Sequence, residues 1–369
     1  MWLRRIKLRN FRNYESAGIN LAAGLNIITG PNGAGKTSLL EAAQYVLCGC
    51  SFRTSREQEM IRQGSSFLRL EAEHDSGGFT RMRAVSLASG APVTVDAGGA
   101  PRWVEPGMVL CFCPDDLQLI KGAPASRRRF LDESISRLRP AHRRLALEYH
   151  KVLSQRNSFL KRARAGYVSP GDIMPWDRQL VVMALAIHAA RREHSRRLAP
   201  FFQEAWSGIT GEETAVAIEY ESQLTRMAGR PDAEGQLLRV LADTRENDMQ
   251  SAVTGTGTHR DEVHFLRAGE PLRQFGSQGE QRTAVLALLL AARGMARAEG
   301  SPPPVLLLDD VMSELDPDRR RLLMKSLAGG QTVITAADGG LFSAEELEGA
   351  AVFEVGRDGI MAGRETSDV

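Results

Sequence analysis

Gly30-Pro31-Asn32-Gly33-Ala34-Gly35-Lys36-Thr37 decides the fold, because this stretch matches the phosphate-binding pattern G-x-x-x-x-G-K-[ST] at every fixed position. The apolar run Leu25-Asn26-Ile27-Ile28-Thr29 predicts a buried strand before it, and residues 38–45 predict a helix after it. Glycines allow the N–H groups of such a loop to turn inward, and the helix N-terminus adds its positive dipole end. A glycine-rich turn with a chance lysine would not need this order of strand, loop and helix. The stretch therefore predicts a nucleoside triphosphate site.

The residue types in and after the loop predict separate roles in that site. Lys36 is expected to reach the β- and γ-phosphates and the Thr37 hydroxyl to hold Mg²⁺. The expected contacts to ATP are Gly30, Pro31, Asn32, Gly33, Ala34, Gly35, Lys36, Thr37 and Ser38.

A second signature is the apolar run Val305-Leu306-Leu307-Leu308 followed by Asp309-Asp310. It predicts a central strand of a parallel sheet whose C-terminal tip delivers an acid to Mg²⁺. Asp309 is expected on the metal, and Asp310 is expected to orient or activate the attacking water. Lys36 and Asp310 are therefore the candidate catalytic residues.

The composition indicates a globular protein of two domains or lobes, since the chain has 369 residues, 43% of them hydrophobic and 25% charged. No apolar run reaches the roughly 18 residues of a membrane span, and the start lacks the pattern of a signal peptide. We therefore expect a cytoplasmic protein without a membrane partner. The net charge is +2, so a polyanion would have to be bound by a local basic surface.

Four cysteines form two C-x-C pairs, Cys48 with Cys50 and Cys111 with Cys113. A zinc site with four cysteine ligands is the alternative to consider, but zinc ligand pairs usually have at least two residues between them. Cys111 and Cys113 also belong to an apolar strand, where buried thiols are common. The pattern favours reduced, structural cysteines.

Strand-rich segments at both ends enclose a helical middle. Strands are expected at 2–8, 67–73, 79–87 and 109–113, with loops or a hairpin around Gly98-Gly99-Ala100-Pro101 and Pro106-Gly107. From about residue 125 to 249 the pattern is charged and helix-periodic, with interruptions at prolines 140, 170, 175, 200 and 231. The predicted domains are an N-terminal ATPase part (1–124), a helical lobe (125–250) and a C-terminal ATPase part (251–369).

Ser277-Gln278-Gly279-Glu280-Gln281-Arg282-Thr283 opens a helix expected at 278–297. Ser277 and Glu280 have the spacing of a capping box, which explains part of the stretch. A polar helix start that contains glycine is also an anion site. The nucleotide of a partner subunit is the natural candidate for its ligand.

The order of these motifs, continued by Ser313-Glu314-Leu315-Asp316, resembles that of the ABC and SMC-type ATPases. The details are similar to the RecF family of bacterial DNA repair and replication ATPases over nearly the whole chain. The stretches that carry this resemblance are Leu8-Arg9-Asn10-Phe11-Arg12-Asn13-Tyr14, Gly49-Cys50-Ser51-Phe52-Arg53-Thr54, Phe112-Cys113-Pro114-Asp115-Asp116-Leu117, Arg127-Arg128-Arg129-Phe130-Leu131-Asp132, Gln155-Arg156-Asn157 and Trp176-Asp177. The implied fold is α/β, an ABC/SMC-like P-loop ATPase head with an inserted, mainly helical lobe.

The resemblance implies an ATP-driven homodimer in which ATP lies between two protomers. Ser277, Gln278, Gly279 and Asp316 would then act in trans on the partner's nucleotide. It further implies binding to double-stranded DNA and to junctions with single strands, a role with RecO and RecR in loading RecA at gaps, and a place in DNA damage repair and the SOS response. Hydrolysis is expected to be weak, stimulated by DNA and used as a switch.

One position departs from the wider ATPase pattern. ABC ATPases usually carry a histidine after the strand that follows the acid pair, but this chain has Val333-Ile334-Thr335-Ala336-Ala337-Asp338 there. Thr335 is therefore the candidate contact to the γ-phosphate.

The DNA candidates are Arg127, Arg128, Arg129 and Arg156, within a stretch that also holds Arg137, Arg139, Arg143, Arg144, Lys161, Arg162 and Arg164. Without the resemblance, such residues are more often a solvated helix face. With it, they predict phosphate contacts without base readout. Three alternatives remain from the residues: a transporter's nucleotide-binding subunit or another non-DNA ABC ATPase, a nuclease of the overcoming-lysogenization-defect type, and an interaction protein that does not hydrolyse ATP.

Overall fold

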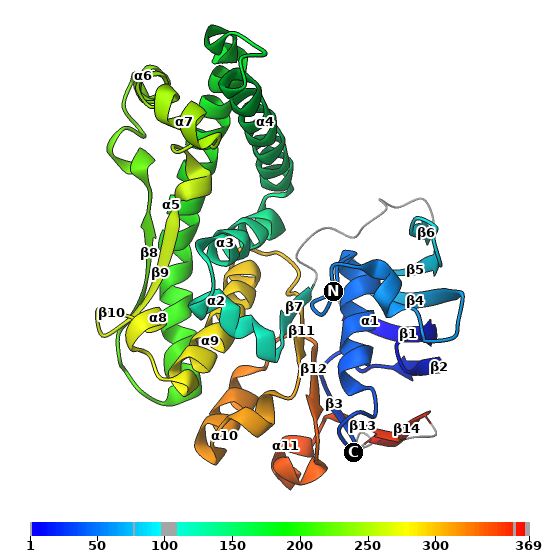
Figure 1. The fold of residues 1–369 in the computed structure, drawn as a ribbon. Helices are drawn as coiled ribbons and strands as arrows, with labels where there is room; N and C mark the ends of the chain where they lie inside the picture. The colour runs from blue at the N-terminus through cyan, green and yellow to red at the C-terminus, as the bar shows by residue number, and fades with distance from the viewer. Residues whose placement is uncertain (1, 77, 97–108, 357–358, 366–369) are drawn as a thin grey trace. The chain divides into compact units, whose positions relative to one another are not determined.

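The computed structural model describes residues 2–76, 78–96, 109–356 and 359–365 (Figure 1). The chain forms two compact units. Unit 1 comprises Met1–Leu117, Phe201–Glu213 and Gln278–Val369, and unit 2 comprises Gln118–Pro200 and Thr214–Ser277. The expected loops at residues 98–101 and 106–107 lie outside the described residues.

The unit boundaries differ from those expected from the sequence. Residues 251–277 were assigned to the C-terminal ATPase part but belong to unit 2. The reason is strand pairing: β9 (Glu262–Arg267) is hydrogen-bonded along its length to β8 (Val216–Glu221), so the two segments fold together. The inserted lobe is therefore not purely helical but contains a small antiparallel sheet.

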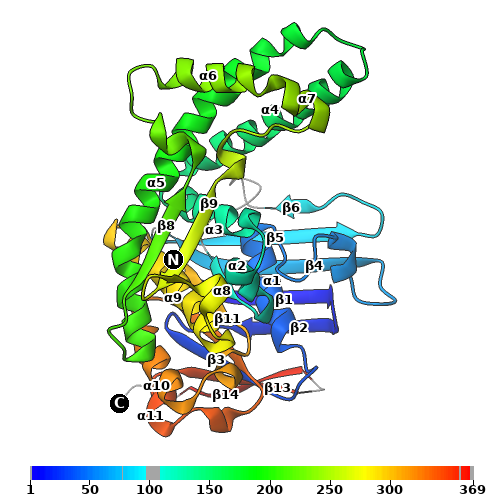
Figure 2. The ribbon, with the colours of Figure 1, turned by 60° about the vertical axis from the view of Figure 1, so that its left-hand side comes forward.

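Unit 1 holds two β-sheets. The first is antiparallel with the strand order β2-β1-β4-β5-β6, and the second has the order β14-β13-β3-β12-β11-β7 with only β14 antiparallel (Figures 1 and 2). The strands of the first sheet are β1 (Trp2–Phe11), β2 (Tyr14–Asn20), β4 (Phe67–Ser76), β5 (Phe79–Ala88) and β6 (Thr94–Asp96). Those of the second are β3 (Leu25–Thr29), β7 (Val109–Phe112), β11 (Val305–Leu308), β12 (Thr332–Ala336), β13 (Ala351–Gly356) and β14 (Gly359–Glu365).

Helix α1 (Lys36–Cys48) contacts strands of both sheets. Leu39, Ala43 and Val46 belong to the same buried apolar cluster as Leu70 of the first sheet and Leu307 of the second. The spacing of these side chains at three, four and seven residues places them on the buried part of a helix. The helix that follows the phosphate loop is thus the centre of the core, and the loop at its N-terminus is held from both sides.

Unit 1 holds further helical segments besides α1. Helix α9 (Gln278–Ala298) packs against β7 and has the predicted bounds to within a residue. The remaining helical segments are the 3-10 helices η1 (Glu57–Met60), η2 (Pro114–Leu117), η6 (Val311–Glu314) and η7 (Gly339–Leu341), with α10 (Pro317–Ser326) and α11 (Ala344–Leu347).

Unit 2 is built on long helices and the three-stranded sheet β10-β9-β8. Its elements are α2 (Gln118–Lys121), α3 (Pro124–Leu138), α4 (Pro140–Arg164), η3 (Pro170–Ile173), α5 (Met174–Thr210), η4 (Gln223–Arg226), α6 (Ala233–Asp243), α7 (Arg245–Ser251), η5 (Thr258–Arg260), β10 (Glu270–Pro271) and α8 (Leu272–Phe275), with β8 and β9. Residues 201–210 of α5 belong to unit 1. None of the helices that the structure describes is both long and apolar enough to cross a bilayer.

The expected interruption at Pro200 is wrong, because α5 continues through it. Proline removes one backbone hydrogen bond and strains the preceding turn. The buried side chains of Leu198 and Phe202 on either side of it, both 0% exposed, stabilise the helix by packing. Tertiary contacts therefore override the local signal at this position.

Candidate functional site

The phosphate loop has the backbone that its glycines predict. Gly30, Gly33 and Gly35 have φ angles of 144°, 81° and 113°, which residues with a Cβ rarely adopt. A Cβ at Gly30 would also lie 2.2 Å from the carbonyl oxygen of Val355. Lys36 Nζ donates to the carbonyls of Gly30 at 2.6 Å and Pro31 at 3.0 Å, so its ammonium lies over the loop. Burial lowers the pKa of Lys36, while Asp310 and Asp309 oppose this shift.

The turn between β1 and β2 packs directly on this loop. Asn13 Nδ2 donates to the Ala34 carbonyl at 3.1 Å. A Cβ added to Gly35 would lie 2.6 Å from both the Asn13 amide and the Tyr14 hydroxyl. Burial raises the pKa of Tyr14 to about 12, so this phenol stays neutral. The absence of a side chain at Gly35 is therefore required by the neighbouring hairpin as well as by the backbone angle.

A buried carboxylate in α1 explains why two of the resembling stretches lie where they do. Glu41 is 0% exposed and accepts two hydrogen bonds from Arg12, at 2.9 and 2.6 Å. Ser51 donates to the same carboxylate at 2.6 Å, and Arg53 lies 3.4 Å from it. A buried charge with such partners is stabilised only while all of them remain in place. Glu41 thus fixes residues 10–14 and 49–54 to the helix of the phosphate loop.

The predicted magnesium ligands meet in the structure. Thr37 Oγ1 donates to the two carboxylate oxygens of Asp309 at 3.0 and 2.9 Å. Strand β11 ends directly before Asp309 and runs parallel to β12, which in turn pairs with β3, the strand before the loop. Burial raises the pKa of Asp309, and hydrogen bonds from Thr335 and Thr37 oppose that shift. Two oxygen donors from separate segments thus lie together at the carboxyl ends of parallel strands.

Asp310 lies beside this pair in a strained backbone conformation. Its φ angle is 49°, in the left-handed region that non-glycine residues seldom occupy. Its Oδ1 is buried and has no hydrogen-bond partner among the described residues. Backbone strain and an unpaired carboxylate oxygen cluster at functional sites. Both features fit the predicted role of Asp310 toward a water molecule.

The assignment of Thr335 to the γ-phosphate is corrected by its contacts. Thr335 is 0% exposed, and its hydroxyl donates to Asp309 Oδ1 at 2.7 Å while accepting the Asp310 N–H at 3.0 Å. Both hydrogen-bonding directions of the hydroxyl are therefore used inside the protein. Thr335 positions the two acids and is not available to a phosphate.

The other predicted segments lie at the starts of two helices of unit 1. Gln278 begins α9 and is exposed, as is the preceding Ser277, and Gly279 is half-buried. Asp316 is exposed and caps α10, with Oδ1 accepting the Arg319 N–H at 3.0 Å. These residues are open to a partner, and their predicted action in trans remains a prediction.

An ion pair that the sequence reasoning missed joins these two segments. Arg282 Nε of α9 lies 2.9 Å from Glu314 Oε2, two residues before Asp316. Burial raises the pKa of Glu314; Arg282 opposes this shift, and Asp310 adds to it. Arg282 belongs to the signature stretch 277–283, and Glu314 belongs to Ser313-Glu314-Leu315-Asp316. The only signal in the sequence was that each of the two residues lies within a predicted motif. The pair connects the signature helix to the neighbourhood of the catalytic acid.

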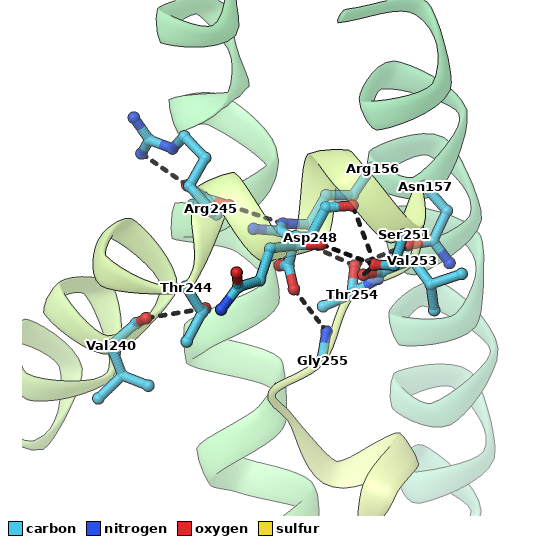
Figure 3. Close-up of polar contacts among 12 residues, drawn as sticks. Arg156, Asn157, Val240, Thr244, Arg245, Asp248, Ser251, Val253, Thr254 and Gly255 are labelled. Atoms are coloured by element: carbon cyan, nitrogen blue, oxygen red, sulfur yellow. Dashed lines mark hydrogen bonds and ion pairs between the residues drawn. The ribbon is translucent and has the colours of Figure 1, made fainter. Parts of the chain in front are cut away.

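The expectation of DNA contact is corrected for two of the four arginines. Arg156 is 0% exposed and donates to Asp177 at 2.8 Å, Asp248 at 2.7 Å and Thr254 at 2.8 Å. Figure 3 shows its guanidinium among α4, α7 and the chain that follows α7. Arg127 is 3% exposed and makes two hydrogen bonds of 2.8 Å to Glu262. Both guanidiniums are bound to internal carboxylates, so neither is presented to a polyanion.

Arg128 and Arg129 differ from these two. Arg128 is half-buried and donates to the Asp261 carbonyl at 2.7 Å, and its pKa is lowered by burial. Arg129 is exposed, 3.8 Å from Glu133 one helical turn away. Arg129 alone of the four predicted arginines presents an exposed guanidinium to solvent, and a nearby acid weakens its field.

A stronger basic surface lies on α4. We define the basic face of α4 as the exposed side chains Arg143, Arg144, Lys151, Lys161 and Arg162. At 100° per residue, their positions fall within an arc of about 100°. They extend along about 28 Å of the helix axis, close to the roughly 34 Å turn of duplex DNA. Of these five, only Lys151 forms an ion pair among the described residues, with Glu148 at 4.0 Å.

Three acidic or histidine side chains around η5 anchor separate helices of unit 2. His259 forms a hydrogen bond of 2.7 Å with Tyr149 of α4. Asp261 accepts one of 3.0 Å from Arg191 of α5, and Glu262 accepts one of 2.8 Å from Arg127 of α3. Burial lowers the pKa of His259 to about 4, so the ring is neutral at pH 7. This segment organises the unit, and the sequence analysis did not single it out.

Comparisons with known proteins agree with this geometry. A family model described as an AAA domain matches residues 5–92. The protein named DNA replication and repair protein RecF from Heliobacterium modesticaldum is 33% identical over 374 residues, covering 96% of this chain and 97% of that protein. The one with the same name from Symbiobacterium thermophilum is 37% identical, covering 92% of each.

Solved structures show the same relationship. A structure of the recombination mediator protein RecF with ATP in the RecFOR pathway has a TM-score of 0.87 at 26% identity, covering 98% of both chains. An SMC head bound to the C-terminal winged-helix domain of ScpA has a TM-score of 0.58 at 14% identity, which shows the fold alone. These matches support the ABC/SMC-like P-loop ATPase fold and not the transporter alternative. The chain belongs to the RecF family of DNA replication and repair proteins.

Proposed function

We propose that this protein is an ATP-controlled switch that closes as a homodimer on DNA during repair and replication. The observation that carries the proposal is the meeting of Lys36, Thr37, Asp309 and Asp310 around the carboxyl ends of parallel strands. Open α/β sheets bind their ligands at that edge. ATP is the proposed ligand because the related structure was solved with it.

The residues present fit Mg²⁺ as well as ATP. A threonine hydroxyl and a carboxylate 2.9 Å apart are hard oxygen donors, which Mg²⁺ prefers, and it commonly takes its other ligands from phosphates and water. When bound, the ion neutralises charge on the β- and γ-phosphates. Lys36 would bind the same phosphates, and Asp310 would orient the attacking water. Thr335 would position Asp309 and Asp310 through its two hydrogen bonds.

Hydrolysis in this proposal is slow and serves to release the dimer. Ser277, Gln278, Gly279 and Asp316 would complete the partner's site; Ser277, Gln278 and Asp316 are exposed, and Gly279 is half-buried. The ion pair between Arg282 and Glu314 supports joint action of the two segments, because it fixes one to the other within a protomer.

DNA would contact the basic face of α4, with Arg129 as a further contact. Five cations spread along about 28 Å suit consecutive phosphates of a duplex and carry no base readout. We therefore propose binding to double-stranded DNA and to duplex–single-strand junctions in the cytoplasm, and cooperation with RecO and RecR in loading RecA. The RecFOR pathway named for the related structure supports these partners.

The test is the molecular mass in solution with ATP and Mg²⁺, with and without duplex DNA. Wild type should form a dimer, Asp310→Asn should keep the dimer after wild type has hydrolysed its ATP, and Lys36→Met should remain a monomer. Lys121→Met, at an exposed lysine at the end of α2, is the matched control and should form the dimer as wild type does, with and without DNA. A mass that never responds to nucleotide would refute the switch.

A further inference from the structure

A groove in unit 1 is lined by none of the residues proposed to bind nucleotide or DNA. It has a volume of about 650 Å³ and is lined by α10 on one side and by η7 with α11 on the other. Helices α10 and α11 are neighbours in Figures 1 and 2. Pockets of about 300–1,000 Å³ are the usual size for binding sites. All of its lining residues belong to unit 1. The groove therefore lies within one compact unit.

The two walls of the groove carry opposite charge. Helix α10 contributes Arg320, Arg321 and Lys325, and α11 with the residue after it contributes Glu345, Glu346 and Glu348. Apolar side chains line the space with them, namely Leu25, Met324, Leu341 and Phe342. A ligand in this groove would meet an apolar surface with cations along one edge and anions along the other.

Several of these charges have no partner across the groove. Arg320 donates to the Leu315 carbonyl, and Glu346 caps α11 through the Ser343 N–H. In contrast, Lys325, Glu345 and Glu348 make no ion pair within the part of the chain that the structure describes. Opposite charges that face one groove without pairing offer complementary contacts to whatever enters it.

We propose that this groove binds a short extended segment of a partner protein. The segment would place an apolar side chain on Met324 and Phe342, an acidic residue toward α10 and a basic residue toward α11. A polyanion would be attracted by one wall and repelled by the other, so nucleic acid does not fit. The proposal does not depend on ATP binding and concerns residues outside the nucleotide site.

The test uses a display library of short random peptides selected on the full-length protein. The selected peptides should share an apolar residue between an acidic and a basic one. Met324→Glu should weaken their binding at least about tenfold, because it places a carboxylate where the apolar anchor packs. Arg56→Glu, a charge reversal of an exposed arginine of unit 1 outside the groove, is the matched control and should bind as wild type does.

A second variant tests the charge order without touching buried residues. Arg321→Glu, Lys325→Glu, Glu345→Lys and Glu348→Lys together keep the net charge and exchange the walls; all four side chains are exposed. This variant should lose the selected peptides and bind versions in which the acidic and basic residues are exchanged. The proposal would be overturned if the selected peptides bind the charge-exchanged variant as well as they bind wild type. It would also be overturned if no selected peptide depends on the groove residues for binding. Loss of the ATP-dependent dimer in either variant would overturn it too and would assign the groove to a second copy.

Discussion

Thr335→Val should impair hydrolysis by removing one hydroxyl while keeping the shape of the side chain. In the structure this hydroxyl donates to Asp309 at 2.7 Å and accepts from the Asp310 N–H at 3.0 Å. Its loss removes a hydrogen bond to a charged group, worth about 1.5–3 kcal/mol, and leaves a backbone donor unsatisfied at a cost of about 1–3 kcal/mol. Water cannot replace it readily, because Thr335 is 0% exposed.

If about 2–3 kcal/mol of this loss falls on the reacting complex, single-turnover ATP hydrolysis slows by about 30- to 150-fold. The Mg²⁺ concentration for half-maximal rate should rise at the same time, since second-shell partners typically change metal affinity by about 10- to 100-fold. Binding of a fluorescent ATP analogue without Mg²⁺ should change little, because Lys36 and the loop are untouched. Thermal unfolding measured in parallel separates loss of fold from loss of function.

Thr335→Ser is the control for this experiment. It keeps the hydroxyl and removes a buried methyl group, so it should cost about 1 kcal/mol of stability and retain most of the rate. A Thr335→Val protein that hydrolyses ATP at the wild-type rate with unchanged Mg²⁺ dependence would refute the positioning role. Equal impairment of the serine variant would assign the effect to packing.

Four further outcomes are expected. Arg156→Ala should lower the free energy of unfolding by about 3–5 kcal/mol in chemical denaturation, because it leaves the buried Asp248 without its cation and Asp177 with Arg245 alone. The double change Arg143→Ala with Arg162→Ala should leave unfolding unchanged and make the slope of log DNA affinity against log salt shallower by about 1.8. Arg282→Glu should weaken the ATP-dependent dimer, and adding Glu314→Arg should restore it, as measured by solution mass. Burial raises the pKa of Asp132, but hydrogen bonds from Arg191 and His142 outweigh it and lower this pKa to about 2. About 2 kcal/mol of stability should therefore be lost as the pH falls from about 4 to about 2. Asp132→Asn should not show that loss in acid denaturation.

Each of these outcomes has a clear contrary result. If Arg156→Ala leaves stability unchanged and makes the slope of log DNA affinity against log salt shallower, Arg156 contacts DNA after all. An unchanged salt slope in the α4 double variant would remove the basic face from the proposal. Failure of the reversed pair to restore the dimer would show that Arg282 and Glu314 act separately. A parallel acid transition in the asparagine variant would place the titrating group elsewhere.

The nucleotide site could be predicted from the sequence because its signals are local. Eight consecutive residues specify the loop, and an apolar run ending in two acids specifies β11 and its tip. Backbone angles, helix start and strand direction follow from residue type at such positions. The meeting of Thr37 and Asp309, 272 positions apart, follows in turn from the parallel sheet that these signals predict.

The basic residues could not be sorted in this way. Arg127, Arg143 and Arg156 cannot be distinguished by residue type, and all three belong to helices. What distinguishes them is a carboxylate supplied from far along the chain, such as Glu262 for Arg127 or Asp248 for Arg156. Long-range partners of this kind leave no local pattern, as the unexpected pairing of β8 with β9 also shows.

The buried triad of Arg156, Asp177 and Asp248 constrains how the family can change over time. Replacing one member alone gives a protein destabilised by several kcal/mol. This is a large share of the roughly 5–15 kcal/mol that is the usual free energy of unfolding of a domain. The three positions should therefore be inherited together or replaced together. The exposed cations of the same helix α4 carry no such linkage, and each can be exchanged alone. Affinity for DNA can then be tuned in small steps by selection while the interior of unit 2 stays the same.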